Sequence, residues 1–164
     1  MRTETITKTL YSFDELSESA QEHALNRLGD INVDHEWWDC TCDDAENIGL
    51  KITSFGERDI DGGFIESAES CAHAILDQHG PDCDTLKDAD RYLSERGDLI
   101  RTWTEDESGL DEKLDNLDNE FLHDLLEDYR IMLSDEYDYL TSREAIVESI
   151  DANGYEFDEN GNLA

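Results

Sequence analysis

The side chains of this chain that could do chemistry are above all carboxylates. Its 164 residues include 44 Asp and Glu against 12 Lys and Arg, which gives a formal net charge of −32. A small domain ordinarily carries a net charge of about 2–8 in magnitude, so solubility alone does not need this many acids. Self-repulsion at this level destabilises the compact state unless salt or a cationic partner screens it. The charge indicates either a function that uses the negative field or an adaptation to a salt-rich cytoplasm.

Acidic side chains recur at steps of three, four or seven along a stretch whose apolar pattern predicts one long helix, from Leu110 to about Tyr139. They are Asp111, Asp115, Asp118, Asp124, Glu127, Asp128, Asp135 and Asp138. Neighbours at such steps lie ~5–6 Å apart on a helix, within a few ångströms of the spacing of phosphates along a DNA strand. A rigid row of carboxylates can therefore imitate a nucleic-acid backbone in a groove lined by Lys and Arg. The alternative is an ordinary solvated helix face.

A second acidic stretch lies in a helix predicted from Asn32 or Asp34 to Gly49. Its acids are Asp34, Glu36, Asp39, Asp43, Asp44 and Glu46. The same stretch contains Trp37 and Trp38, and Trp is enriched at the hot spots of protein interfaces. Core packing is the alternative for the two indoles, and we favour it for at least one of them.

Metal and enzyme chemistry are less well supported by the pattern. Cys40, Cys42, Cys71 and Cys83, with His73 and His79, supply enough soft ligands for one zinc ion, but no Cys-x₂-Cys pair occurs. Residues 57–62 look like the first half of a calcium loop, but the twelfth position is Ala68, where a bidentate Glu is needed. No Gly-x-Ser-x-Gly and no phosphate-cradling loop occurs. We expect no enzyme activity and no cofactor.

The periodicity predicts an α+β fold, with a small antiparallel sheet packed with several helices, including the long acidic one, in a single domain over residues 1–164. The expected strands are residues 3–11, 50–55 and 64–65, with a turn at 59–63 and a terminal hairpin over 155–163. The expected helices cover residues 13–28 behind a Ser12–Glu15 capping box, 67–79, 84–96 ended by Gly97, and 142–150 capped by Thr141 or Ser142. Without a signal peptide or a membrane-length apolar run, we expect a cytoplasmic protein with reduced cysteines.

Several segments resemble a family of small acidic proteins encoded by bacteriophages and prophages. The similar segments are Tyr11–Ser17, Asp30–Asp34 with Trp37 and Trp38, Gly49–Ile52, Phe64–Glu69, Asp128–Leu133, Glu136–Tyr137 and Tyr139–Ser142. Together they touch most of the chain. The family has no established activity, so the resemblance implies no catalytic residues. It implies a context, that of a phage or prophage accessory gene.

The first functional hypothesis is a non-enzymatic inhibitor that mimics nucleic-acid charge and binds a basic nucleic-acid-binding protein of a bacterial or archaeal host, such as a restriction enzyme or a CRISPR effector. Direct binding to nucleic acid or to an anionic membrane is disfavoured by charge. The alternative is an acidic structural or assembly partner that binds through Trp37, Trp38 and apolar surface, with the charge serving solubility or salt adaptation. Oligomeric state and target are open at this point.

Overall fold

The described chain forms two compact units. The computed structural model describes residues 7–104 and 107–164. Its terminal unit consists of residues 7–37 and 135–164, and its central unit of the described part of residues 38–134. The described residues contain six α-helices and one two-stranded antiparallel sheet, which confirms the predicted α+β class with one long helix. That the whole chain is a single domain stays a prediction.

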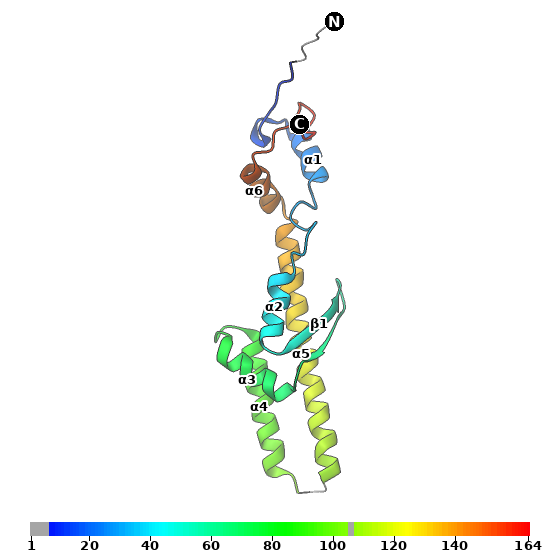
Figure 1. Ribbon diagram of the computed structural model, residues 1–164, viewed down its shortest axis with the longest axis vertical. Helices are drawn as coiled ribbons and strands as arrows, with labels where there is room; N and C mark the ends of the chain where they lie inside the picture. Colours follow the sequence, from blue (N-terminus) through cyan, green and yellow to red (C-terminus); the bar gives the residue numbers. More distant parts are fainter. Residues whose placement is uncertain (1–6, 105–106) are drawn as a thin grey trace, which may run out of the picture. The chain divides into compact units, whose positions relative to one another are not determined.

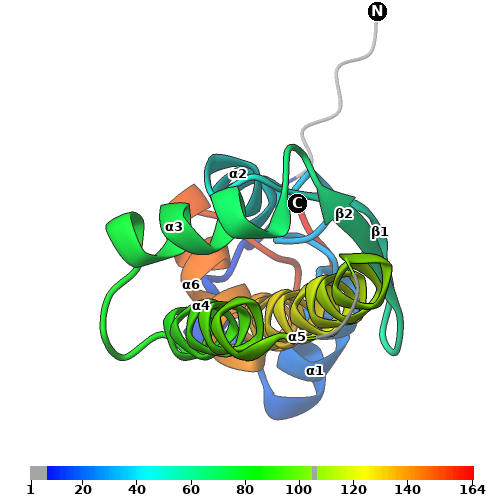
Figure 2. The same ribbon diagram turned by 90° about the horizontal axis from the view of Figure 1, so that it is seen from below.

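Nine elements follow one another along the chain. They are η1 (Phe13–Glu15), α1 (Glu18–Arg27), α2 (Asp39–Asn47), β1 (Leu50–Phe55), β2 (Ile60–Phe64), α3 (Ala68–Gln78), α4 (Asp84–Thr102), α5 (Glu107–Leu140) and α6 (Arg143–Asn153), counted over the described residues. The long helix α5 belongs to the central unit up to Ser134 and to the terminal unit beyond it. In the central unit, α4 and α5 run side by side (Figure 1, Figure 2).

The sheet of the central unit is a hairpin whose turn differs from the predicted one. The backbone N–H of Gly56 donates to the carbonyl of Asp59 at 2.8 Å, so the chain turns over residues 56–59. The predicted turn at 59–63 is wrong, since Gly62 pairs with Ile52 inside β2. A Cβ on Gly62 would lie 2.9 Å from the Leu126 side chain of α5, and 2.5 Å from a β1 carbonyl. This glycine therefore serves close packing rather than the turn.

Aromatic stacking joins the sheet to the helix pair in the core of the central unit. The rings of Tyr92 and Phe121 stack with centroids 4.4 Å apart, and Phe64 of β2 lies 5.8 Å from Phe121. Around them lie the buried side chains Ala45, Ile48, Leu50, Ala68, Cys71, Ala72, Ile75, Ala89, Leu125, Leu126 and Tyr129. Each large apolar side chain buried here contributes about 1.5–3 kcal/mol. This core holds α4 and α5 together and so positions their acids.

Two helix boundaries correct the sequence prediction. Helix α4 continues through Gly97 to Thr102, and Gly97 does not adopt the positive φ with which a glycine commonly ends a helix. Helix α2 begins only at Asp39, and residues 30–37 form turns. Within those turns the Asn32 side chain donates to the carbonyl of Leu140 at 3.0 Å and accepts from the Ser149 hydroxyl. Such side-chain bonds compete with helix formation.

Capped helices around a small core make up the terminal unit. Ser12 and Glu15 form the predicted capping box at η1, and the Ser142 side chain accepts from the N–H of Ala145 to begin α6. The helix predicted over residues 13–28 is wrong at its start, because Leu16 is extended and α1 begins only at Glu18, behind a new cap at Ser17. The buried residues are Phe13, Leu16, Ala20, Ala24, Ile146, Ile150 and Phe157. Phe157 is fully buried in this core, so the C-terminal segment that contains it packs against the helices of the unit.

Two predicted β elements are reduced to single bridges. Of the strand expected over residues 3–11, residues 3–6 lie outside the described chain and residues 7–10 are not in a strand. Tyr11 and Phe157 exchange two backbone hydrogen bonds of 2.9 Å, and Phe157 bridges in turn to Leu163. The segment over 155–163 therefore turns back without forming a regular hairpin, because neither neighbour pairs with it beyond one residue. No described helix has the length and apolar character needed to cross a membrane.

Candidate functional site

The carboxylates of the helix pair α4–α5 fall into two groups. The outer acids are exposed and make none of the ion pairs found among the described residues: Asp90, Glu95, Asp111, Glu112, Asp115 and Glu120. The inner acids are half-buried where the two helices meet: Asp88, Asp118, Asp124 and Asp128. Of the outer acids, Asp111 and Asp115 are among those predicted from the sequence. Asp90 and Glu95 were missed, since nothing in the local pattern indicates that α4 lies beside α5. Glu112 and Glu120 were also missed, although they lie within the predicted helix at steps of three and four from Asp115 and Asp124, so the spacing could have found them.

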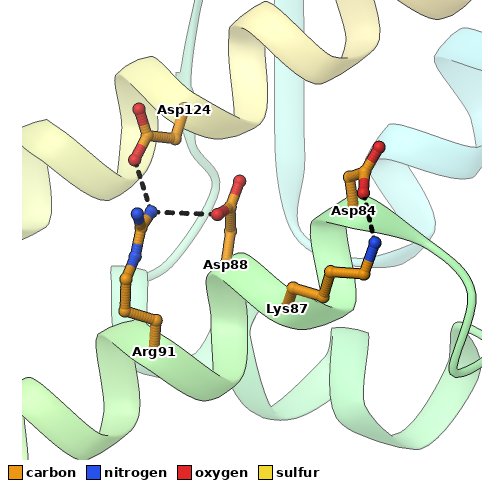
Figure 3. Close-up of polar contacts among 5 residues, drawn as sticks. All are labelled: Asp84, Lys87, Asp88, Arg91 and Asp124. Atoms are coloured by element: carbon orange, nitrogen blue, oxygen red, sulfur yellow. Dashed lines mark hydrogen bonds and ion pairs between the residues drawn. The ribbon is translucent and has the colours of Figure 1, made fainter.

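The inner acids hold the helix pair together. Arg91 of α4 donates to Asp124 of α5 at 2.6 Å and to Asp88 of its own helix at 2.9 Å, as Figure 3 shows. The hydroxyl of the buried Tyr92 donates to Asp118 at 2.6 Å, and Arg96 lies 3.9 Å from the same carboxylate. Asp118 and Asp124 were predicted as binding residues, but the structure places them in contacts between the two helices.

Asp128 lies where several carboxylates gather. Burial, followed by the charges of Asp88 and Asp84, raises the pKa of Asp128 to about 6. Lys87 donates to Asp84 at 2.6 Å beside this cluster (Figure 3). Next to Asp128 on the helix, Glu127 accepts two hydrogen bonds from Arg130, which hold the pKa of Glu127 below its ordinary value. Of these two predicted binding residues, Glu127 is paired with Arg130 and Asp128 lies among other carboxylates of the helix pair.

The acids of α2 are all exposed and differ in their contacts. Asp39, Asp43 and Glu46 belong to no described ion pair, whereas Asp44 accepts from the hydroxyl of the buried Tyr129 at 2.7 Å. The same Asp44 oxygen lies 3.6 Å from Nε2 of His79, whose Nδ1 is 2.7 Å from the hydroxyl of buried Thr85. The pKa of Tyr129 is above its ordinary value, first because the side chain is buried and second because its hydroxyl donates to Asp44.

The remaining predicted acids belong to the terminal unit. Asp34, Glu36, Asp135 and Asp138 are all exposed there. Asp34 lies 3.4 Å from Nδ1 of the adjacent, exposed His35. The acids predicted as binding residues are thus distributed over both compact units. Those on α2 and on α5 up to Ser134 belong to the central unit.

The two tryptophans are half-buried and pack in different units. The Trp37 ring lies 5.5 Å from the ring of Tyr137 in the terminal unit. The Trp38 ring lies 5.7 Å from that of Phe55 on β1, edge to face. Both contacts favour the packing interpretation of these side chains.

The Cys and His residues predicted as zinc-ligand candidates form no metal-binding group in the described part of the chain. Within the described ranges, no group of three or more His, Cys, Asp or Glu side chains is arranged to hold a metal ion. Cys40 is exposed, Cys42 and Cys83 are half-buried, and Cys71 is buried. Burial raises the pKa of the Cys71 thiol to about 12, so this thiol is neutral. The calcium-like segment 57–62 lies across the hairpin turn and the start of β2.

Comparison of this chain with protein-family models, with curated proteins and with solved structures finds no match. On the surface of the described chain, the outer acids of the helix pair form a group of six exposed carboxylates outside the described ion pairs.

Proposed function

We propose that this protein is a non-enzymatic inhibitor of phage type. It mimics the charge of nucleic acid and blocks a basic DNA- or RNA-binding surface of a host defence protein, of the anti-CRISPR or anti-restriction kind. The observation that carries the proposal is the set of six outer acids on the helix pair, exposed and outside the described ion pairs, in a chain of net charge −32. The resemblance to acidic phage proteins supplies the biological context.

Geometry supports the comparison with a duplex. Packed helices lie about 8–10 Å apart, and the grooves of B-DNA separate its two phosphate rows by about 6–12 Å. Asp111 and Asp115, one helical turn apart, form one short row on α5, and Asp90 and Glu95 add exposed charge on different faces of the neighbouring helix α4. Since the inner acids and the aromatic core fix the two helices, little order has to be created when the partner binds.

Affinity capture at two salt concentrations tests the proposal. The tagged full chain is incubated with a bacterial lysate at about 0.1 M and about 1 M salt, where the Debye length falls from about 10 Å to about 3 Å. We expect one nucleic-acid-binding complex to be retained at low salt, released at high salt and displaced by added DNA or RNA. A purified partner then gives the inhibition constant against its nucleic acid, which we expect to be competitive.

A partner that persists at high salt and ignores nucleic acid would overturn the proposal. It would favour the alternative, an assembly protein that binds through apolar surface. The central unit offers such surface at Ile65 and Ile100, which are 54% and 50% exposed. Alanine substitutions of these two residues would then abolish capture, whereas neutralising the outer acids would leave capture unchanged.

A further inference from the structure

A cavity of about 290 Å³ opens in the central unit between the end of α2 and the beginning of α3. Its lining includes Ile48, Ile65 and Cys71 together with Glu46, Glu66 and Ser70. The volume lies at the lower limit of small-molecule sites, which measure about 300–1,000 Å³. The cavity is therefore suited to a group of the size of one long side chain.

The wall of this cavity combines the apolar side chains of Ile48, Ile65, Cys71 and Ala74 with the polar residues Asn47, Ser67 and Ser70. Ile48 and Cys71 are each 1% exposed, and the raised pKa of the Cys71 thiol keeps it neutral. Ile65, by contrast, is 54% exposed and offers an apolar wall to an incoming group. This part of the cavity can receive a methylene stem, but it offers no nucleophile.

The charge at the cavity is negative. Glu46 of α2 and Glu66 of the β2–α3 connection are exposed and belong to none of the described ion pairs. The carboxyl end of α2 adds its partial negative charge, and its last turn contains no basic residue. The amino end of α3 opposes this with about half a positive charge. Two full carboxylate charges outweigh that half charge, and the Ser67 side chain already accepts from the Ser70 N–H.

We propose that this cavity receives one arginine side chain from the basic partner. This inference rests on the proposed function and names one contact of it. A wall that is part apolar and part polar, with Glu46 and Glu66 in its lining, suits arginine better than lysine, because the guanidinium is planar, is more weakly hydrated than an ammonium group and has several N–H groups to donate to carboxylates. Such an anchored side chain gives specificity that a diffuse acidic surface does not supply.

A small probe tests the cavity without the partner. The full chain, labelled with ¹⁵N, is titrated with N-acetyl-arginine amide and, separately, with the uncharged isostere N-acetyl-citrulline amide and with N-acetyl-lysine amide. For the arginine probe we expect saturable shifts concentrated at the amides of Gly49, Ser67 and Ser70. Citrulline should produce none, and lysine should bind more weakly. Shifts spread evenly over the outer acids of the helix pair would mean unspecific cation binding and would overturn the inference.

A charge-matched pair of variants sharpens the test. Glu46→Gln combined with Glu66→Gln should weaken the arginine probe about tenfold or more, since charge-assisted hydrogen bonds are lost. Asp77→Asn combined with Asp82→Asn removes two exposed charges outside the cavity lining and should leave probe affinity within about twofold. Thermal unfolding of both variants checks that each is folded. Equal affinity in the two variants would refute the cavity as an arginine site.

Failure of this inference and failure of the proposed function give different results. If the probe binds in the cavity but no nucleic-acid-binding complex is captured, the arginine site stands and the inhibitor proposal fails. If the complex is captured, and Glu46→Gln with Glu66→Gln changes neither probe binding nor capture, the inhibitor proposal stands and the arginine site is wrong.

Discussion

Helix α5 contains two sets of aspartates that look alike in the sequence and differ in the folded chain. Asp111 and Asp115 are exposed, and no described ion pair uses them, whereas Asp118 and Asp124 accept hydrogen bonds from Tyr92 and Arg91 of α4. The first pair is exposed to solvent and is available to a partner. The second pair has exchanged that availability for contacts that fix the two helices. The acids of one helix therefore have different roles: the exposed ones can contribute to binding a partner, and those that contact α4 contribute to stability.

The largest expected effect is on partner binding when the outer acids are reversed. Replacing Asp90, Glu95, Asp111 and Asp115 together by Lys should weaken binding to the captured partner at least about 100-fold, because attraction becomes repulsion across the interface. The dissociation constant at about 0.1 M salt is the measurement. The unfolding free energy should not fall, since net self-repulsion decreases.

The control for this variant carries the same change in net charge in the other unit. Asp30, Glu148, Asp151 and Glu159 are exposed acids of the terminal unit, and their replacement by Lys should reduce affinity less than about tenfold. If both variants lose binding equally, net charge rather than the helix pair determines affinity, and the comparison between inner and outer acids has no functional meaning.

Removing an inner acid should change stability instead. Asp118→Ala leaves the hydroxyl of Tyr92, a residue only 2% exposed, without its acceptor. We expect a loss of about 1–3 kcal/mol in the free energy of unfolding, measured by urea denaturation. Asp115→Ala, three residues earlier on the same helix, should change it by no more than about 0.5 kcal/mol.

An amide at position 118 separates the hydrogen bond from the charge. Asp118→Asn retains an acceptor for the Tyr92 hydroxyl and should restore at least half of the stability lost in Asp118→Ala. Loss as large as that of the alanine variant would show that the hydrogen bond is not what stabilises the helix pair.

Asp128 predicts a pH dependence with a definite sign. Its pKa of about 6 in the folded chain exceeds the ordinary value of 3.8, so the folded state binds the proton more tightly. The resulting stabilisation is full below pH 3.8 and is lost as the pH rises through about 6. Asp128→Asn should therefore raise the unfolding free energy at pH 7.5 by about 1 kcal/mol, since screening by solvent reduces the full effect of the shift.

The pH experiment compares wild type with Asp128→Asn between pH 5 and 7.5. The difference in their unfolding free energies should grow with pH. Protonation of the other acids at low pH reduces self-repulsion in both proteins alike, so this contribution cancels in the difference. A constant difference over this range would mean that Asp128 does not titrate between pH 5 and 7.5 and would contradict its raised pKa.

The smallest expected effect concerns Arg130, which pairs with Glu127 of its own helix and also contacts the hairpin turn. Arg130 donates to Glu127 at 2.6 Å and to the carbonyl of Glu57 at 3.3 Å. Because the Glu127 carboxylate is well exposed, Arg130→Gln should cost no more than about 0.5 kcal/mol. Arg91→Gln, which disconnects Asp124 from Asp88, should cost more. The reverse order, measured by thermal unfolding, would contradict the distinction between contacts on the surface and contacts between the helices.

Local patterns were sufficient where the cause is local. Ser67 and Ser142 begin helices at or next to the predicted positions, because a cap satisfies backbone groups within four residues. The Ser12–Glu15 capping box is present but begins only the single turn η1, and α1 starts behind Ser17. Prediction failed where distant parts decide. Gly97 does not end α4, and residues 3–11 do not form the expected strand where they are described, since strand pairing needs a partner that only the fold supplies.

The sequence by itself determined the charge, the helical periodicity and the length of α5, because each depends on residue types and their spacing along the chain. Only the tertiary structure decided which acids remain available. Asp115 and Asp118 are three residues apart and chemically identical, yet one is exposed and the other meets Tyr92. That difference arises because burying Tyr92 against Phe121 brings α4 to one side of α5 and leaves another side in solvent. A linear pattern of acids contains no information about which side will be covered.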